Sequence, residues 1–366
     1  MKHPTDAVIE RAWRSLTGSS SVLGISVPDH LLRGQCILIT GAGGSIGSAL
    51  AHAVAERKPA QILLLDASEQ ALFAIDRELA APHTPILASV ADRAALDEVF
   101  ALYRPQIVFH AAAFKHLPLM ERHPFAAMQN NAVATFRLTQ TAVNHRAGQV
   151  VLVSTDKAVA PTSIMGASKR IAELTSLALA TPATQVKAVR LGNVYASQGS
   201  VAQLFAQQIA QNQPLTVTDP RATRYFLTID QTTALLLLAL APQFSSAILV
   251  PELAPPIRVE DLALALIRAA GANVPITYTG LRPGEKLHEQ LLAPDESFLV
   301  ASAAPLRPIR SATISASRAS DLIAALQQAV DDRNLHQLLH AVHDLIPAYQ
   351  PSESILAGHS LAEPRA

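Results

Sequence analysis

Short apolar runs alternate with amphipathic stretches over the first half of the chain. Most of these runs are apolar at consecutive positions, which is typical of strands that are buried on both faces. We expect strands at Gln35–Thr40, Gln61–Asp66, Pro85–Ser89, Gln106–His110 and Gln149–Ser154. The stretches between them are expected to form helices at residues 45–57, 68–80, 92–102 and 124–146. Strands that alternate with helices imply right-handed βαβ units, so the pattern predicts an α/β fold with a Rossmann-like doubly wound parallel sheet.

Composition and charge narrow the class of protein. Of the 366 residues, 49% are hydrophobic and 16% are charged, which is enough apolar material for a large core. The 29 basic residues balance the 29 acidic ones, and a chain without an excess of Lys and Arg is not expected to bind nucleic acid or an acidic membrane surface. The single cysteine, Cys36, excludes an intramolecular disulfide framework and a cysteine-based metal cluster.

The sequence predicts neither a membrane segment nor a metal site. The longest apolar run, residues 234–241, is far shorter than the roughly 20 residues that cross a bilayer. The first residues carry acidic side chains and do not form a secretory signal. The thirteen histidines are scattered along the chain, so we predict no metal. We therefore expect a soluble, cytoplasmic protein.

A glycine cluster follows the first predicted strand and opens a helix. Gly41, Gly44 and Gly47 belong to the segment TGAGGSIG, in which a tight turn and a helix N-terminus allow the backbone to approach a pyrophosphate. Asp66 ends the second strand, near the spacing at which a carboxylate binds the ribose hydroxyls of NAD and repels the 2′-phosphate of NADP. The alternative is an ordinary turn, with Asp66 capping the next helix.

A second polar group follows the strand that ends at Ser154. Thr155, Asp156 and Lys157 supply a hydrogen-bonding hydroxyl, an acid and a base at the carboxyl end of a strand, where ligands bind in doubly wound sheets. Met165 and Lys169 lie four residues apart, so they share one helix face. A short-chain dehydrogenase usually has Tyr where this chain has Met165, which cannot transfer a proton. A solvated strand end with a local ion pair is the simpler alternative.

Several long blocks carry a resemblance to a known family. They are TGAGGSIGS (40–48), HAAAFKHLPLME (110–121), Asn130-Asn131, STDKAVAPTSIMGASK (154–169), RLGNVYASQGSV (190–201), PLTVTDPRATRYFLTI (214–229) and GLRPGEKLHEQLL (280–292). Together they resemble the CapD-like polysaccharide biosynthesis family of extended short-chain dehydrogenases/reductases, whose studied members include UDP-N-acetylglucosamine 4,6-dehydratases. The chain is similar to a free-standing catalytic portion of that family. Ser89 stands where the family usually has the carboxylate that meets the adenine amine.

The resemblance implies a reaction, a cofactor and a role for each residue. The sugar is oxidised at C4 by NAD, loses water between C5 and C6, and is reduced at C6, which gives a 4-keto-6-deoxy sugar nucleotide. Asp156 is implied as the acid at C6, Lys157 as the base at C5, Thr155 as the partner of the 4-hydroxyl and Lys169 as the ligand of the nicotinamide ribose. Because Met165 cannot serve as the base for the 4-hydroxyl, Asp156 or Thr155, acting through water, would have to do so.

The remaining binding residues are also implied by the resemblance. The cofactor would contact the glycine loop, Asp66 and Lys169, and the loop contacts are Gly41, Gly44, Ser45, Ile46 and Gly47, together with Ala111 after the fourth strand. A nucleotide diphosphate needs cations and donors, and the implied substrate ligands are Lys115, Asn193, Arg224, Tyr225, Arg282 and Glu285. Taken alone, Arg-Pro-Gly-Glu at 282–285 is only a turn signature.

We expect the following division of the chain. It consists of a helical arm (1–33), an NAD-binding Rossmann domain (34–190), a mainly substrate-binding part with segments that return to the sheet (191–295), a C-terminal helical segment (296–350) and a tail without apolar periodicity that is expected to be disordered (351–366). A helix at about 7–17 in the arm would serve as structural support or as an oligomer contact.

The leading interpretation is a UDP-N-acetylhexosamine 4,6-dehydratase for surface polysaccharide or glycoconjugate synthesis. A nucleotide-sugar 4-epimerase would share the cofactor but would need no elimination. A non-catalytic protein that binds NAD or a nucleotide sugar is the third possibility, and Met165 is the feature that favours it. By analogy with short-chain dehydrogenases we expect a homo-oligomer.

Overall fold

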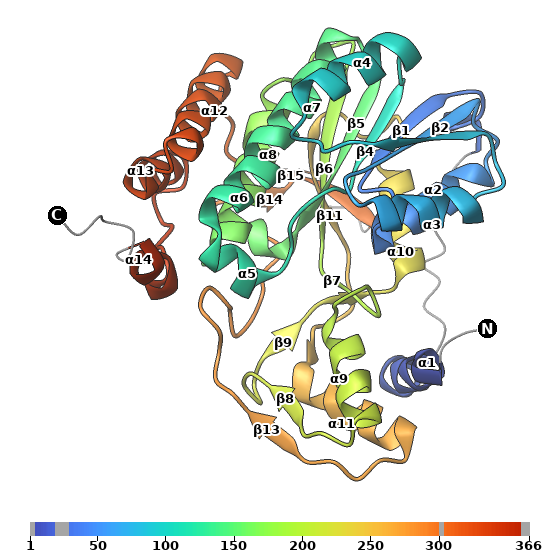
Figure 1. The fold of residues 1–366 in the computed structure, drawn as a ribbon, viewed down its shortest axis with the longest axis vertical. Coiled ribbons are helices and arrows are strands. Elements are labelled where there is room, and N and C mark those ends of the chain that lie inside the picture. Colours follow the sequence, from blue (N-terminus) through green and yellow to red (C-terminus); the bar gives the residue numbers. More distant parts are fainter. Residues whose placement is uncertain (1–3, 19–28, 300–303, 360–366) are drawn as a thin grey trace.

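A computed structural model describes residues 4–18, 29–299 and 304–359 of the chain. Its larger body is built on a nine-stranded sheet with the order β14-β15-β11-β6-β5-β4-β1-β2-β3 (Figure 1). The strands are β1 (Cys36–Thr40), β2 (Gln61–Asp66), β3 (His83–Leu87), β4 (Ile107–His110), β5 (Gln149–Thr155), β6 (Gln185–Leu191), β11 (Ala247–Pro251), β14 (Ser297–Phe298) and β15 (Leu306–Arg310). All pairings from β11 to β3 are parallel, whereas β15 runs antiparallel to both β11 and β14. The predicted α/β fold with a doubly wound sheet is confirmed.

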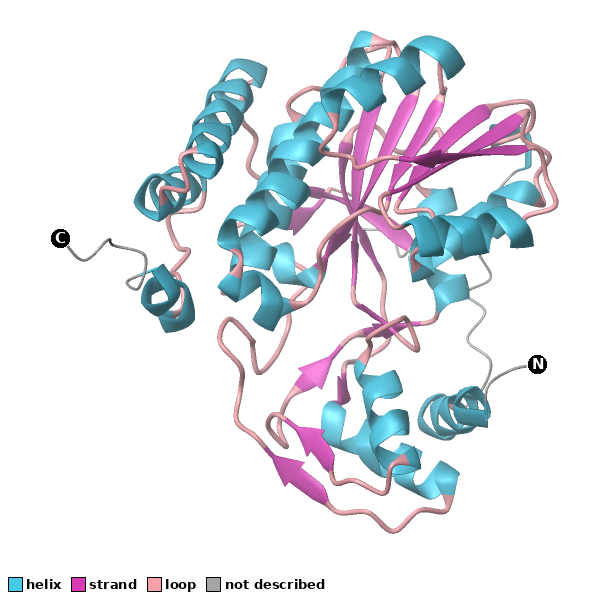
Figure 2. Cartoon of the chain, in the orientation of Figure 1, coloured by secondary structure: helices cyan, strands magenta, loops and turns pink. Residues whose placement is uncertain are grey.

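Helices cover both faces of this sheet (Figure 2). One face carries α2 (Ser45–Ala55), α3 (Glu69–Glu78) and α10 (Ile229–Leu238), and the other carries α4 (Arg93–Tyr103), α7 (Ala134–Asn144) and α8 (Ile164–Leu177). Successive residues of a strand point to opposite faces, so Ile37 and Ile39 of β1 pack under the first layer and Leu38 under the second. Because both faces are covered, the strands are apolar at consecutive positions.

A smaller lobe hangs below the carboxyl ends of the central strands (Figure 1). It contains β7 (Asn193–Val194), α9 (Val201–Ala210), β8 (Leu215–Val217), β9 (Thr223–Arg224), β10 (Phe226–Leu227), β12 (Ile257–Arg258), α11 (Val259–Ala270) and β13 (Ile276–Tyr278). The arm helix α1 (Pro4–Thr17) packs on α9 and α11, where Ile9 and Ala12 are buried. The Trp13 ring lies 4.4 Å from the ring of Tyr195, between centroids. The arm therefore supports the smaller lobe of its own chain.

The C-terminal helices form a third cluster against α8. They are α12 (Ala316–Asp331), α13 (Leu335–Leu345) and α14 (Glu353–His359), and they pack on α5 (Leu117–Arg122) and α6 (Pro124–Met128). Of residues 351–366, which are expected to be disordered, 353–359 are helical and 360–366 lie outside the described residues. Ile355 is fully buried and the Ser352 hydroxyl donates a hydrogen bond to the Glu121 carboxylate, and these two contacts anchor a segment that has no apolar period of its own. No helix in the described ranges is long and apolar enough to cross a membrane.

Two predicted elements differ from the structure. The helix expected at 124–146 is interrupted by a π-helical turn, Gln129–Val133, between α6 and α7. Within it, the Asn131 amide accepts from the backbone N–H of Phe114 (2.8 Å) and donates to the Phe114 carbonyl (2.9 Å), so the turn ties the segment after β4 to the helices. The third strand begins at His83, two residues before the predicted start, because His83 pairs in register with Ile62.

A fully buried ion cluster joins the sheet to α8 and to the chain after the smaller lobe. The Arg190 guanidinium, 0% exposed on β6, donates two hydrogen bonds of 2.9 Å to Glu173 and bonds of 2.6 and 2.9 Å to Glu296. The Arg170 guanidinium lies 2.9 Å from Glu173 and 3.1 Å from Glu296. Two cations and two carboxylates therefore neutralise each other in the interior, and they hold the pKa of Glu296 down at about 2 against the effect of burial.

We predict that Arg190→Met is strongly destabilising. The substitution leaves Glu173 and Glu296 with only Arg170, and breaking a buried pair in this way typically costs about 3–5 kcal/mol. Urea unfolding of the variant measures the loss. Arg221→Met is the control, because Arg221 is exposed and pairs with Asp219 at the surface, where little change is expected. Equal stability of the two variants would mean that the cluster is not a structural centre.

Candidate active site

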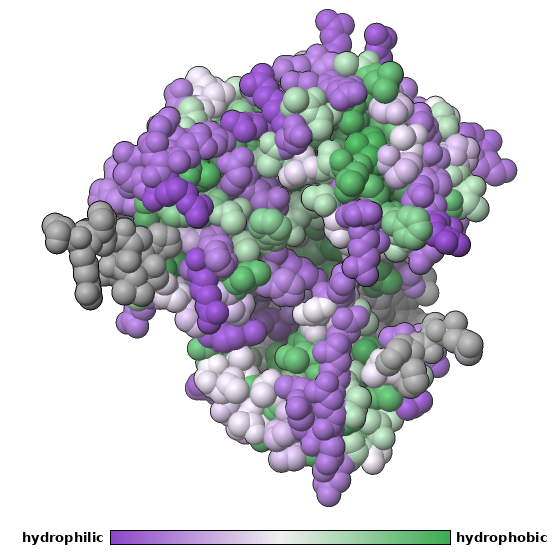
Figure 3. Space-filling view, in the orientation of Figure 1, coloured by the Kyte–Doolittle hydropathy of each residue, from purple (hydrophilic) through white to green (hydrophobic). Residues whose placement is uncertain are grey.

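One cavity of about 890 Å³ lies between the larger body and the smaller lobe. Figure 3 shows the hollow between these two parts. Most of the predicted site residues line it: Gly41, Gly44, Ser45, Ile46, Gly47, Ala111, Lys115, Thr155, Lys157, Lys169, Asn193, Arg224, Arg282 and Glu285. Asp66, Asp156 and Tyr225 do not line it. The cavity therefore connects the glycine loop, the end of β5 and the arginines of the smaller lobe.

The glycines of the loop bring its backbone close to this cavity. Gly41 has a left-handed φ of +68°, and a Cβ there would lie 2.6 Å from the backbone nitrogen of Ala112. A Cβ on Gly47 would lie 2.0 Å from the carbonyl oxygen of Gly41. Gly44 precedes the first turn of α2 and offers no side chain to cap it. Free N–H groups at a helix N-terminus attract anions, so this loop fits a pyrophosphate.

The Asp66 carboxylate is hydrogen-bonded to the glycine loop and to the residue before α3. One carboxylate oxygen accepts from the backbone N–H of Gly43 at 2.9 Å, and the other accepts from the N–H of Ser68 at 2.9 Å. The carboxylate therefore stabilises both the loop and the start of α3. Each oxygen keeps a further lone pair, and contact with a ribose stays a prediction.

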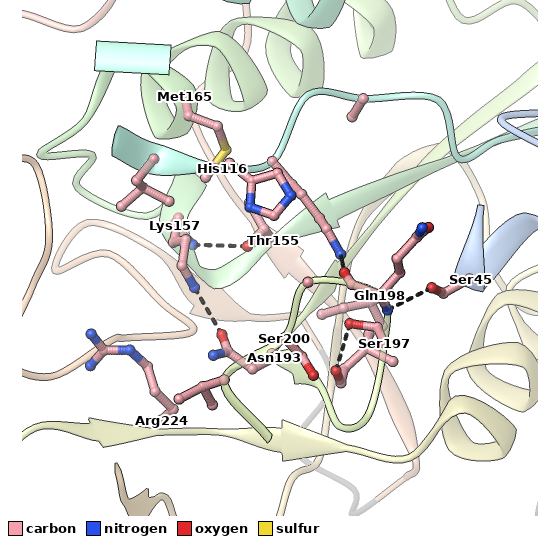
Figure 4. Close-up of a pocket in the computed structure, with 18 of the residues that line it drawn as sticks. Ser45, His116, Thr155, Lys157, Met165, Asn193, Ser197, Gln198, Ser200 and Arg224 are labelled. Carbon is pink, nitrogen blue, oxygen red and sulfur yellow. Dashed lines mark hydrogen bonds between the residues drawn. The ribbon is translucent and has the colours of Figure 1, made fainter. Parts of the chain in front are cut away.

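A strap from the smaller lobe crosses the cavity to the glycine loop. It consists of residues 196–200, and Gln198 lies at its centre (Figure 4). The backbone N–H of Gln198 donates to the Ser45 hydroxyl at 2.9 Å, and its carbonyl accepts from the Lys115 ammonium at 2.6 Å. Both bonds are made by the backbone of Gln198, so no side-chain signal could have predicted this contact.

The turn after β5 places the candidate acid and base together. The side chain of Asp156 is fully buried, and its Oδ1 accepts from Lys157 Nζ (2.9 Å) and from the Thr155 hydroxyl (3.0 Å). Lys157 Nζ also donates to Asn193 Oδ1 at 3.0 Å (Figure 4). Burial disfavours the ammonium, but the charges of Asp156 and Glu289 outweigh it and raise the pKa of Lys157. Lys157 is a cation in this arrangement.

Helix α8 lies directly on this turn. A Cβ on Gly166 would lie 2.3 Å from the Lys157 carbonyl oxygen, so only glycine allows so close an approach. The helix begins where Ser163 accepts from the backbone N–H of Gly166 at 3.0 Å. Met165 and Lys169 both line the cavity, as their shared face predicts. Burial lowers the pKa of Lys169 to about 8, although Glu173 acts in the opposite direction.

The smaller lobe brings two arginines to the other end of the cavity. Arg224, nearly buried, donates to Glu285 at 2.8 Å, and the more exposed Arg282 donates to the same carboxylate at 3.2 Å. Tyr225 takes part only through its backbone, whose carbonyl accepts from the N–H of Asn193 at 2.7 Å. Asn193 meets Lys157 in this structure, and its predicted contact with a diphosphate remains untested.

No group of three or more potential metal ligands occurs within the described ranges. One detail of the sequence analysis needs correction, since the histidines are not all scattered. His336 and His340 lie one turn apart on α13. Both are exposed, and the pair alone does not make a metal site.

The fold and the site define a Rossmann-fold protein of the extended short-chain dehydrogenase/reductase class. The glycine loop, the polar turn after β5 and the lobe over the strand ends are its parts. A family model described as "Polysaccharide biosynthesis protein" matches residues 37–305. The chain belongs to that family, and the resemblance found in the sequence is confirmed.

Curated relatives agree on the family and differ in their printed activities. The chain is 41% identical over 285 residues to the capsular polysaccharide biosynthesis protein CapD of Staphylococcus aureus. The matched region covers 75% of this chain and 48% of CapD. It is 33% identical over 275 residues to a UDP-glucose 4-epimerase of Rickettsia akari, and this match covers 72% of this chain and 79% of the epimerase. The chain spans about half the length of CapD and of the EpsC protein of Bacillus subtilis.

Solved structures show the same fold. Pen from Bacillus thuringiensis superposes with a TM-score of 0.68 at 27% identity, covering 82% of this chain and 99% of Pen. DesIV, a dTDP-glucose 4,6-dehydratase from Streptomyces venezuelae solved with NAD and TYD, gives a TM-score of 0.62 at 22% identity and covers 70% and 88% of the two chains. At that identity the likeness to DesIV shows the fold alone.

We predict that Gly47→Ala abolishes dinucleotide binding. The new methyl group would collide with the Gly41 carbonyl and force the loop away from the helix N-terminus. Calorimetric titration with NAD measures the affinity, and circular dichroism checks the fold. Gly148→Ala is the matched control, because a Cβ there would meet its nearest atom at an ordinary 3.4 Å. If Gly47→Ala bound NAD with unchanged affinity, the glycine loop would not be the binding site of the pyrophosphate.

Proposed function

We propose that the protein is an NAD-dependent dehydratase that converts a UDP-N-acetylhexosamine, with UDP-GlcNAc the first candidate, to its 4-keto-6-deoxy form for a surface polysaccharide or glycoconjugate. One observation carries the proposal. Lys157, which is hydrogen-bonded to the buried Asp156, lines the same cavity as the glycine loop and the two arginines. A hexose held between a dinucleotide and its own diphosphate would present its reacting carbons there.

NAD is the cofactor that the residues fit best. The backbone-only loop at Gly41 and Gly47 suits a pyrophosphate, and the carboxylate of Asp66 beside it disfavours a 2′-phosphate. Lys169 lines the same cavity and would bind the nicotinamide ribose. When bound, NAD supplies the hydride acceptor for C4 and the hydride donor for C6. The NAD-bound DesIV structure supports the same choice by fold.

The proton transfers fall to three neighbouring residues. Neutral Lys157 would remove the C5 proton, and the protonated Asp156 carboxyl would supply the proton with which O6 leaves as water. Asp156 lies behind Lys157 and does not reach the cavity surface, so it needs an intermediary or a side-chain rotation. Thr155 lines the cavity and its hydroxyl donates to Asp156 Oδ1, which supports a route in which it would pass the proton of the 4-hydroxyl to that carboxylate. This route would replace the missing Tyr at Met165.

A 4-epimerase is the second candidate, because a UDP-glucose 4-epimerase matches this chain over most of its length. Incubation of the purified protein with UDP-GlcNAc, followed by mass spectrometry, separates the possibilities. Loss of one water mass supports the dehydratase, and an isomer of unchanged mass supports the epimerase. An unaltered nucleotide sugar, with NAD and UDP-GlcNAc both bound, would support a non-catalytic binding protein.

We predict that Asp156→Asn lowers the rate of water loss by about 10²–10⁴-fold, the range expected for one acid–base group. The amide cannot accept the proton from Thr155 and pass it on. NAD content should stay at the wild-type level, because Asp156 is not in contact with the glycine loop. Asp321→Asn, at an exposed position on α12, is the control. Wild-type turnover by Asp156→Asn would rule out Asp156 as the acid.

A further inference from the structure

A carboxylate that the sequence analysis did not single out lies beside the candidate base. Glu289 follows the arginine segment 282–285, and its side chain is 1% exposed. Its Oε1 lies 3.6 Å from Lys157 Nζ, and its Oε2 lies 3.5 Å from Lys286 Nζ. Oε2 has no hydrogen-bond partner within the described residues. A buried carboxylate needs compensating positive charge, and Glu289 has it in the two ammonium groups on either side.

The charges around Lys157 form an alternating row. Asp156, Lys157, Glu289 and Lys286 follow one another through separations of 2.9, 3.6 and 3.5 Å. Lys286 is itself anchored, since its ammonium donates to the Val159 carbonyl at 2.6 Å, just after the turn that carries Asp156 and Lys157. The two ends of the row are therefore tied to the same turn.

We propose that Glu289 is a positioning residue for proton transfer at C5, which acts by holding the Lys157 ammonium between two carboxylates and stabilising its charge. The inference rests on the dehydratase function proposed above. In the step concerned, the C5–H bond breaks and its proton passes to the neutral Lys157 amine. The electron pair forms the C5–C6 double bond as the C6–O bond breaks, and O6 takes the proton of the Asp156 carboxyl and leaves as water. Lys157 ends the step as an ammonium.

Glu289 affects this step in two opposite ways. By stabilising the ammonium it makes Lys157 a stronger base, which speeds proton abstraction once the amine is neutral. It also lowers the fraction of Lys157 that is neutral at a given pH. The charged groups facing Lys157 are Asp156 and Glu289, which raise its pKa, and Arg224, which lowers it. Lys286 faces Glu289 on the far side. Removing the charge of Glu289 therefore makes Lys157 a weaker base. It also increases the fraction of Lys157 that is neutral at a given pH.

The test is the pH profile of kcat for water loss from UDP-GlcNAc. In Glu289→Gln we expect the acidic limb to move to lower pH by about 1–3 pH units, the effect of one opposite charge at this range. The rate at the alkaline plateau should fall by about three- to tenfold, because a weaker base abstracts the proton more slowly. The two profiles therefore cross. KM should change little, since Glu289 does not line the cavity.

Two further variants separate positioning from structural support. Glu289→Asp keeps the charge and should restore the limb to within a few tenths of a pH unit of the wild type. Glu252→Gln removes an exposed carboxylate after β11 and should leave the profile unchanged. A uniform loss of rate in Glu289→Gln at every pH, with the limb unmoved, overturns the proposal.

A second measurement does not depend on turnover. Titration of the ¹³Cε lysine signals by NMR, with the Lys157 signal assigned by its loss in Lys157→Arg, reports the charge of Lys157 directly. The chain has seven lysines, so the signals can be separated. In the wild type Lys157 should titrate above the ordinary lysine range, and in Glu289→Gln it should titrate lower. Titration of wild-type Lys157 at or below the ordinary lysine range overturns the inference, even if Glu289→Gln does not fold. Absence of water loss in the wild type, with this titration as expected, would sink the dehydratase function alone.

Discussion

The buried pairing of Arg190 with Glu173 and Glu296 fixes the geometry on which the site depends. Glu173 belongs to α8, the helix that carries Met165 and Lys169, and it also accepts from the Ser154 hydroxyl at 2.6 Å, one residue before the polar turn. Glu296 lies a few residues beyond Glu289, so the same arginine holds the chain that leaves the arginine segment. An interior ion cluster tolerates little movement, because any separation exposes an uncompensated charge to a medium of low dielectric constant. The ion cluster thereby fixes the positions of α8, the turn after β5 and the segment at Glu296 relative to one another.

The sequence was most informative where one segment determines its own structure. The strand runs β1 and β2 are buried on both faces, and the glycine loop between β1 and α2 needs residues without side chains, so both features can be recognised locally. The polar turn at Thr155–Lys157 was predicted from its place after a strand. The neighbouring Glu289 was not predicted, because the second Glu of GEKLHEQ becomes significant only when the fold brings it 3.6 Å from Lys157. The π-helical turn and α14 were not predicted for the same reason. Each is stabilised by a hydrogen bond to a residue distant in sequence, made by Asn131 in the first case and by Ser352 in the second.

The arm helix shows how a distant segment can shape the cavity. Tyr195 lines the cavity, and its hydroxyl donates to the Ile9 carbonyl of α1 at 2.8 Å while its ring meets Trp13. The strap at 196–200 begins directly after Tyr195, so the arm fixes one end of the strap and the Ser45 hydroxyl fixes its centre. Residues 4–17 therefore pack with the smaller lobe, although the next strand in sequence, β1 at Cys36–Thr40, belongs to the sheet of the larger body.

The charged residues of the cavity neutralise one another in pairs. Glu285 accepts from both Arg224 and Arg282, and Lys157 lies between Asp156 and Glu289. A diphosphate that bound the arginines would compete with Glu285 for them, because phosphate accepts the same planar fork. Glu285 and Glu289 are four residues apart in one segment, which is pinned to β9 by the bond from Arg224 to the Leu287 carbonyl at 3.1 Å. Arg224 thus contacts this segment both at the Glu285 carboxylate and at the Leu287 carbonyl. The arginine end of the cavity and the charged groups around Lys157 therefore meet in one short segment.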